Sequence, residues 1–180
     1  MIFRRADSKE MIRLWQKQFG EKDLFTREFF ARKINTGDAV FFAAEQDGEL
    51  IGELYAYTEL EDHTFAQKNS RAYLCAFRIR KDLRGQGIGT GLIQYAVTEL
   101  GKSGYTEITI GVDSADAGLL QYYRNLGFTQ EIGIYTEDPC SRMNICGLRN
   151  VSRLHFYCAK YNISQHKHVC WCIIYLIKDK

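Results

Sequence analysis

A cluster of glycines stands where the sequence changes from a strand-like to a helix-like pattern. Residues 71–79 read as a strand and residues 92–100 as a helix, and the turn between them contains Gly85, Gly87, Gly89 and Gly91. Glycine has no Cβ, so successive backbone N–H groups can converge on one point. The helix that follows adds its own free N–H groups and the positive end of its dipole. The turn therefore predicts an anion site suited to a phosphate or pyrophosphate group.

Two common phosphate-binding motifs do not fit this turn. A dinucleotide fingerprint requires Gly-x-Gly-x-x-Gly, but the third glycine position holds Thr90 or Leu92, depending on the starting glycine. A Walker A loop ends in Gly-Lys-Ser/Thr, which Gly101–Ser103 supplies, but it also needs an earlier glycine where this chain has Ala96. We therefore exclude both motifs.

The other hydrophobic patterns predict one domain with the order α-α-β-β-β-α-β-α-β. The expected helices cover residues 7–20, 26–34 and 92–100, with a fourth capped within 113–116 and ending near 126. The expected strands cover residues 39–46, 49–58, 71–79, 107–112 and 128–135. Asp7 and Glu10 have the spacing of a capping box, and Asp47-Gly48 is a preferred hairpin turn. On the strand 71–79, alternation predicts one shared face for Tyr73, Cys75, Phe77 and Ile79.

Two motifs link this element order to a known family. Arg84, Gly87 and Gly89 match the pattern Arg/Gln-x-x-Gly-x-Gly/Ala. Residues 116–128 match Asn-x-x-Ala-x-x-Leu-Tyr-x-x-x-Gly-Phe, with Asp116 and Leu119 in place of its Asn and Ala. Over residues 1–136 the chain resembles the GNAT superfamily of acyl-CoA-dependent N-acyltransferases. The resemblance implies an α/β fold with a central, twisted, mostly antiparallel sheet, flanked by helices and splayed into a V between its two central strands.

The resemblance also implies a function. The chain would bind acetyl-CoA and move its acetyl group to a primary amine of a small molecule, a protein N-terminus or a lysine, by direct transfer in a ternary complex. A non-catalytic acyl-CoA-binding sensor or scaffold is the alternative. The residues implied in cofactor binding lie on the strand before the turn, in the turn and in the second motif. They are Phe77, Arg78, Ile79, Arg84, Gly85, Gln86, Gly87, Ile88, Gly89, Thr90, Asp116 and Tyr123.

Acetyl transfer needs a base for the amine, a donor for the oxyanion and a proton for the leaving thiolate. The resemblance places Tyr123 at the general-acid position beside the CoA sulfur, and the backbone N–H of Ile79 or its neighbour at the oxyanion. The residues themselves leave the base open. Glu53 is the catalytic candidate, and the loop that follows its strand offers Glu59, Glu61, Asp62 and His63 as alternatives.

The sequence leaves two alternative roles, functional or structural, for each of three further side chains near these positions. Tyr55 and Tyr57 would either line the acceptor pocket or pack the sheet as alternating aromatic residues. Cys75 would be a nucleophile only with a histidine partner, and no histidine lies near it in sequence, so we expect a buried thiol.

Charge divides the chain into two parts. Residues 1–138 hold 17 Lys and Arg against 21 Asp and Glu, a net charge of −4, whereas residues 139–180 hold 7 against 1, a net charge of +6. We therefore expect an acetyltransferase core over 1–136 and an atypical basic, Cys- and His-containing segment over 137–180. Within that segment, residues 170–177 are expected to form a last strand that completes the sheet.

Composition and spacing exclude other kinds of partner. No apolar run reaches the roughly 20 residues of a membrane helix, so we expect no membrane partner, a cytoplasmic location and reduced cysteines. Cys170-x-Cys172 and His166-x-His168 lack the gap usual for a zinc knuckle, so we expect no metal. The total net charge of +2 is too small to argue for nucleic acid. Exposed strand edges would allow a homodimer.

Overall fold

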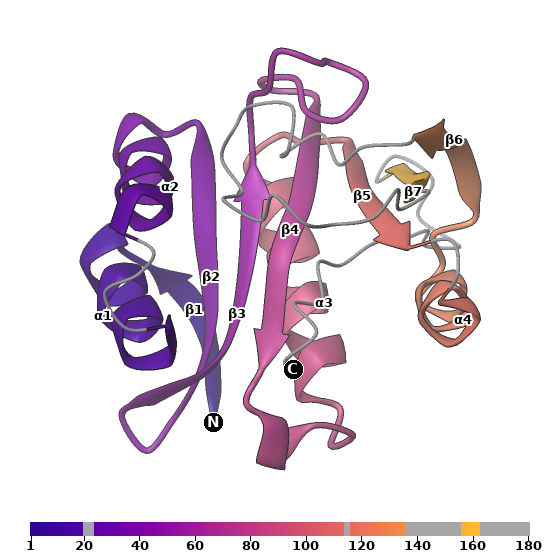
Figure 1. Ribbon diagram of the computed structural model, residues 1–180. Helices are drawn as coiled ribbons and strands as arrows, with labels where there is room; N and C mark the ends of the chain where they lie inside the picture. The colour runs from indigo at the N-terminus through magenta and orange to yellow at the C-terminus, as the bar shows by residue number, and fades with distance from the viewer. Residues whose placement is uncertain (20–23, 114–115, 136–155, 163–180) are drawn as a thin grey trace.

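The computed structural model describes residues 1–19, 24–113, 116–135 and 156–162 (Figure 1). In chain order the elements are β1 (Ile2–Ala6), α1 (Ser8–Phe19), α2 (Leu24–Thr36), β2 (Ala39–Gln46), β3 (Glu49–Tyr57), β4 (Arg71–Ile79), the short 3₁₀ helix η2 (Lys81–Leu83), α3 (Ile88–Lys102), β5 (Glu107–Asp113), α4 (Ala117–Asn125), β6 (Gln130–Tyr135) and β7 (Phe156–Asn162). Among the described residues, no helix is both long and apolar enough to cross a membrane.

Within the described residues, the strands form one seven-stranded sheet in the order β1-β2-β3-β4-β5-β7-β6. Neighbouring strands run antiparallel, except that β4 and β5 run parallel. Figure 1 shows α1 and α2 on one face of the sheet and α3 on the other. The predicted mixed, mostly antiparallel sheet flanked by helices is therefore confirmed.

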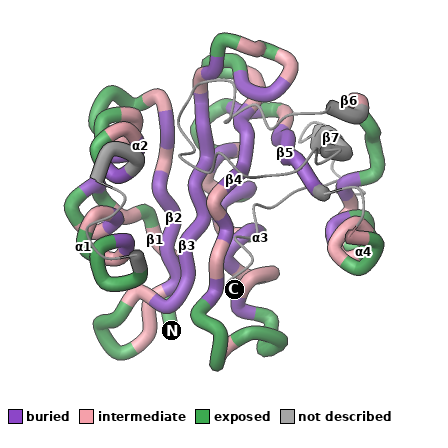
Figure 2. The backbone as a smooth tube through the Cα atoms, viewed as in Figure 1, coloured by how far each residue is buried: buried purple, intermediate pink, exposed green. Residues whose placement is uncertain are grey.

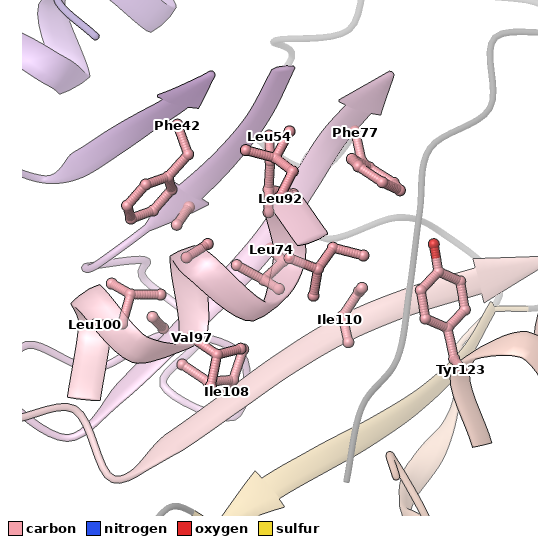
Figure 3. Packing of buried hydrophobic residues seen from close by; sticks show 14 of the residues in the cluster. Phe42, Leu54, Leu74, Phe77, Leu92, Val97, Leu100, Ile108, Ile110 and Tyr123 are labelled. Atoms are coloured by element: carbon pink, nitrogen blue, oxygen red, sulfur yellow. The ribbon is translucent and has the colours of Figure 1, made fainter. Parts of the chain in front are cut away.

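Each face of the sheet has its own hydrophobic core. Figure 2 shows that the central strands are buried along most of their length and that the outer sides of the helices are exposed. The core on the α3 face includes Leu54, Leu74, Leu92, Ile108 and Tyr123 (Figure 3). The core on the α1–α2 face includes Met11, Trp15, Phe30, Tyr55 and Cys75.

The first strand was not expected from the sequence. β1 pairs antiparallel with β2, from Ile2 opposite Glu45 to Ala6 opposite Phe41. The strand has five residues, two of which are arginines, so its hydrophobic pattern is too short to predict a strand. Ion pairing holds this edge strand, because Arg4 donates to Glu10 at 2.6 Å and to Glu45 at 2.7 Å.

The capping box predicted at the start of α1 is confirmed. The Glu10 backbone N–H donates to the Asp7 carboxylate at 2.8 Å, and the Asp7 backbone N–H donates to the Glu10 carboxylate at 3.0 Å. Glu10 therefore serves both the helix cap and the ion pair with Arg4.

We expect the Glu10–Arg4 pair to stabilise the fold only above acidic pH. Hydrogen bonding to Arg4 lowers the pKa of Glu10 below its usual 4.5. A group whose pKa is lowered by folding stabilises the folded state above its unfolded-state pKa, and that contribution is lost as the pH falls through the folded-state pKa. Glu10→Gln keeps a capping side chain and should cost about 1 kcal/mol of unfolding free energy at pH 7. Urea unfolding at pH 7 and at pH 3 checks this, and an equal difference between the two proteins at both pH values would contradict it.

β4 and β5 pair over only part of their length. The ladder joins residues 71–74 to residues 107–110, although β4 continues to Ile79 and β5 to Asp113. Beyond Leu74 the two strands diverge, as Figure 1 shows. The V-shaped splay expected between the central strands is therefore present.

A β-bulge in β4 overturns one expectation from the sequence. Cys75 lies opposite Tyr55 and Arg78 lies opposite Glu53, so two residues of β4 face one residue of β3. The bulge includes Ala76, whose φ is +47°. The extra residue shifts the alternation of side chains by one position.

The shared face predicted for Tyr73, Cys75, Phe77 and Ile79 is therefore wrong. Tyr73 and Cys75 pack on the α1–α2 face, whereas Phe77 and Ile79 pack on the α3 face. Strict alternation could not predict this change, because nothing in the residue types of β4 marks the bulge.

Of the segment 137–180, the structure describes residues 156–162. These residues form β7, which lies between β5 and β6 and pairs antiparallel with both. The strand predicted over 170–177 lies outside the described residues, and so do Cys170, Cys172, His166 and His168.

Candidate active site

The glycine-rich turn connects β4 to α3 through η2. The backbone φ is +78° at Gly85 and +79° at Gly87, values that strain any residue with a Cβ. Gly87 is the N-cap of α3 and makes no side-chain cap. The free N–H groups of the first turn of α3 therefore lie beside exposed backbone, where an anion can bind them.

Two contacts hold this turn against β4. The Arg84 Nε donates to the Ile79 carbonyl oxygen at 3.0 Å. A Cβ on Gly89 would lie 2.8 Å from the Phe77 Cζ, so glycine is what lets α3 approach the strand this closely. Ile88 is buried in the α3-face core, and the Gln86 side chain is exposed and lies 3.5 Å from the Asp82 carbonyl oxygen.

The backbone of Ile79 faces the gap between β4 and β5. Successive N–H groups of a strand point to opposite sides. The Arg80 N–H donates to the Ile51 carbonyl oxygen at 2.8 Å, toward β3. The Ile79 N–H therefore points away from β3, toward β5, where the β4–β5 ladder has already ended at Leu74. This geometry supports the predicted oxyanion donor, because a ligand in the gap could accept a hydrogen bond from Ile79.

Tyr123 lies on α4 and is fully buried. It belongs to the α3-face core together with Phe77 of β4, and its ring lies 6.2 Å from the Phe128 ring, centroid to centroid. In Figure 3 the Tyr123 hydroxyl is directed toward the side on which Phe77 lies. The fold thus brings together the predicted acid from the second motif and the strand that precedes the glycine turn.

The neighbouring Tyr122 links α4 to α3. Its hydroxyl lies 3.1 Å from the Thr90 Oγ1, in the first turn of α3, and burial raises the pKa of Tyr122. Thr90 was expected to bind the cofactor, and the structure shows that its hydroxyl is shared with Tyr122. Local sequence pattern could not predict this contact, because the two residues lie 32 positions apart.

Asp116 is the N-cap of α4, and its Oδ1 accepts a hydrogen bond from the Leu119 backbone N–H at 2.9 Å. The sequence assigned this carboxylate to the cofactor, and that role stays a prediction. The cap explains why Asp is tolerated where the family motif has Asn, because both side chains accept this bond.

We expect Asp116→Ala to destabilise the protein by about 1 kcal/mol, because Ala cannot cap the helix. Asp116→Asn should keep unfolding free energy close to that of the parent. Denaturant unfolding of both variants measures the cap. Equal losses in the Ala and Asn variants would show that the charge of Asp116, and not its capping bond, stabilises the fold.

Glu53 lies on the opposite face of the sheet from Tyr123. Only 1% of its surface is exposed, and its Oε2 accepts a hydrogen bond from the Trp15 Nε1 at 2.5 Å. Its Oε1 accepts a hydrogen bond from the Arg78 Nε. Burial raises the pKa of Glu53, while Arg78 and Trp15 act in the opposite direction. Both carboxylate oxygens are thus engaged with donors from the protein.

Comparison with known proteins agrees with this geometry. A family model described as the acetyltransferase (GNAT) family matches residues 8–128, which is more than half of the chain. The chain belongs to the GNAT acetyltransferase family. The match includes the glycine turn, Glu53 and Tyr123.

Two curated relatives are similar in sequence to this GNAT chain. An uncharacterized N-acetyltransferase of Methanocaldococcus jannaschii is 25% identical over 117 residues, which cover 65% of this chain and 51% of the relative. An N-alpha-acetyltransferase of Arabidopsis thaliana is 26% identical over 112 residues, which cover 62% of this chain and 55% of the relative. The chain spans about half the length of these relatives.

Solved structures share the GNAT fold. A ribosomal-protein-alanine N-acetyltransferase from Brucella melitensis aligns with a TM-score of 0.66 at 17% identity and covers 90% of this chain and 99% of its own. An aminoglycoside 6'-N-acetyltransferase complexed with coenzyme A aligns with a TM-score of 0.63 at 15% identity and covers 91% and 97%. At these identities the likeness is one of fold.

The other candidate bases of this GNAT chain take part in the structure of their own loop. Glu59 lies 2.9 Å from the His63 Nε2 and also accepts a hydrogen bond from the Lys68 backbone N–H at 2.8 Å. Asp62 accepts a hydrogen bond from the Thr64 backbone N–H at 3.0 Å, and Glu61 is exposed. These contacts are typical of a loop held by its own side chains.

The aromatic pair on β3 is core. Tyr55 and Tyr57 are both fully buried, and the Tyr55 hydroxyl donates to the Phe30 carbonyl oxygen at 2.8 Å. Neither side chain lines an open acceptor pocket.

Cys75 is a buried free thiol in the same core. Among the described residues, no group of three or more His, Cys, Asp or Glu could hold a metal ion.

Trp15 is a functional neighbour of Glu53 that local sequence does not reveal. It lies within the helix predicted over residues 7–20, where an aromatic side chain indicates only core packing. The indole N–H that reaches Glu53 depends on how α1 lies on the sheet, which local sequence does not show.

Proposed function

We propose that this protein is an N-acetyltransferase that moves the acetyl group of acetyl-CoA to a primary amine by direct transfer in a ternary complex. The observation that carries the proposal is the gap between β4 and β5. The gap opens beyond Leu74, where the β4–β5 ladder ends, and the glycine turn follows the end of β4 at its open side. The Ile79 N–H is directed away from β3 into this gap, and the Tyr123 hydroxyl is directed toward the side on which Phe77 of β4 lies. The family match and the coenzyme A complex of a GNAT structure support acetyl-CoA as the donor substrate.

Each part of the site has a role in the proposed reaction. The first turn of α3 would bind the pyrophosphate of CoA, with the Arg84 guanidinium beside it. The neutral amine nitrogen attacks the thioester carbonyl carbon, and the Ile79 N–H stabilises the oxyanion that forms. The C–S bond then breaks, and Tyr123 gives its hydroxyl proton to the thiolate. The proton released by the amine passes to a base on the acceptor side. The sequence alone suggested Glu53 for this base, but in the structure both of its carboxylate oxygens accept hydrogen bonds from Trp15 and Arg78.

The names of similar proteins indicate the class of acceptor. Three of the proteins that resemble this chain are named as an N-alpha-acetyltransferase, a ribosomal-protein-alanine N-acetyltransferase and an aminoglycoside 6'-N-acetyltransferase. Each name places the acetyl group on a nitrogen, and we propose a primary amine of a small molecule, of a protein N-terminus or of a lysine as the acceptor of this chain. A cytoplasmic location and a homodimer stay predictions, the latter through the edge strands β1 and β6.

Release of the free CoA thiol from acetyl-CoA, measured against a panel of amines, tests this function. The panel should contain an aminoglycoside, peptides with free N-termini and peptides with an internal lysine. Amine-dependent release that Gly87→Glu abolishes would establish transfer and identify the acceptor class. Saturable acetyl-CoA binding without release of the CoA thiol on any amine would contradict the proposed acetyltransferase activity and favour a non-catalytic acyl-CoA-binding module.

A further inference from the structure

Two buried side chains, Trp15 and Glu53, meet the partly buried Arg78 on the α1–α2 face, directly after the bulge in β4. Glu53 of β3 accepts hydrogen bonds from Trp15 of α1 and from Arg78 of β4. The Arg78 Cζ lies over the Trp15 ring, 5.0 Å from its centroid. Each member therefore contacts the other two, and Glu53 lies opposite Arg78 in the β3–β4 register.

The bulge is what brings this pair together. If β4 continued without the bulge, the register of Cys75 with Tyr55 would place Phe77 opposite Glu53. Because side chains alternate along a strand, the Arg78 side chain would then lie on the α3 face, within an apolar core. Glu53 would stay buried, with Phe77 as its cross-strand neighbour in place of Arg78. Both charges would be buried without a counter-ion, which is strongly unfavourable.

The choice of register also decides which backbone donor faces the gap. In the bulged register the Arg80 N–H points to β3 and the Ile79 N–H points to the gap. Removing the bulge shifts the alternation by one residue, so the Ile79 N–H would turn toward β3. The Phe77 ring would also leave Gly89 and α3.

We propose that Glu53 is a positioning residue that, through Arg78 and Trp15, selects the bulged register of β4 and so aims the Ile79 N–H into the gap. Buried ion pairs are weak evidence for stability, but they can specify one register over another. The catalytic part of this inference rests on the proposed function. It replaces the role of general base that sequence alone suggested for Glu53.

Two variants and one control test the proposal. Glu53→Gln removes the charge, and the double variant Glu53→Leu with Arg78→Met replaces the ion pair by apolar side chains of similar length. Glu107→Gln is the matched control, because Glu107 pairs with Arg71 at the other end of β4. The readouts are kcat, the KM for acetyl-CoA, the pH profile of kcat/KM, the Tm and hydrogen exchange of the amides of residues 76–80.

A positioning role predicts a specific combination of results. Glu53→Gln should lower kcat by about 10²-fold, as expected for a donor displaced by about 1 Å, and should leave the acidic limb of the pH profile in place. The double variant should keep a Tm near that of the parent, because apolar pairs often replace buried ion pairs without loss. Its kcat should stay low, and hydrogen exchange of residues 76–80 should change. The control should match the parent in kcat and in this exchange.

Three results would overturn the proposal. Loss of the acidic limb in Glu53→Gln would make Glu53 the general base. Full recovery of kcat in the double variant would make the pair merely structural. Unchanged exchange of residues 76–80 in the double variant would show that the ion pair does not select the register. This last measurement needs no turnover, so it separates a failure of the register selection from a failure of the proposed function.

Discussion

Gly87→Glu should abolish acetyl-CoA binding while the protein still folds. Nothing lies within 4 Å of a Cβ built on Gly87, so the added side chain meets open space. The strain of a positive φ at this position costs roughly 1–3 kcal/mol of stability. A carboxylate about 4 Å from a pyrophosphate oxygen adds about 4 kcal/mol of repulsion, which corresponds to a nearly 10³-fold loss of affinity.

Gly104→Glu provides the matched control for this result. Gly104 follows the other end of α3, has a φ of +91° and also has open space around its Cβ. The control therefore carries the same charge and a similar backbone strain but is far from the glycine turn. Calorimetric titration of acetyl-CoA should show binding to Gly104→Glu and none to Gly87→Glu. Equal affinities in the two variants would remove the glycine turn as the pyrophosphate site.

Tyr123→Phe should lower kcat by about 10²- to 10⁴-fold, the range typical of a lost general acid. The phenol has a usual pKa of about 10 and the thiol about 8.5, so the proton moves to the thiolate only where the site holds the two groups together. The ring of Phe preserves the packing against Phe128 and the α3-face core. The affinity for acetyl-CoA should therefore change little.

Tyr122→Phe is the natural comparison, because it removes a hydroxyl from the adjacent residue. Its hydroxyl lies 3.1 Å from the Thr90 Oγ1 in the first turn of α3, the proposed pyrophosphate site, so its loss should raise the KM for acetyl-CoA more than it lowers kcat. Steady-state kinetics of both variants, with circular dichroism to confirm folding, make the measurement. Similar kcat values for Tyr123→Phe and the parent would rule out Tyr123 as the acid.

The sequence predicted what depends on local pattern. The capping box at Asp7, the glycine turn and the second motif over residues 116–128 are each continuous in sequence. The capping box located the first helix, and the other two motifs, together with the element order, led to the family and the fold. β1 was not predicted because its five residues gain stability from pairing with β2 and from the ion pair of Arg4 with Glu45, which lies 41 residues further along the chain.

The side-chain surroundings of the site depended on tertiary structure. Strict alternation placed Phe77 on the wrong face, because the bulge at Ala76 follows from the pairing of β4 with β3. Glu53 was identified as important from its position on a strand, but its partners Trp15 and Arg78 come from two other elements. Such contacts become predictable only when the register of the sheet is known.

The position of β7 between β5 and β6 determines when a nascent chain can complete the sheet. β6 is an edge strand whose described neighbour is β7, and β7 is the last described strand to be synthesised. Until residues 156–162 leave the ribosome, β5 and β6 both lack the strand that lies between them in the described part of the sheet. An open sheet edge is a template for aggregation. During translation the chain is therefore prone to aggregation until β7 pairs with β5 and β6, which are synthesised earlier. A premature stop before residue 156 would leave the chain in that state.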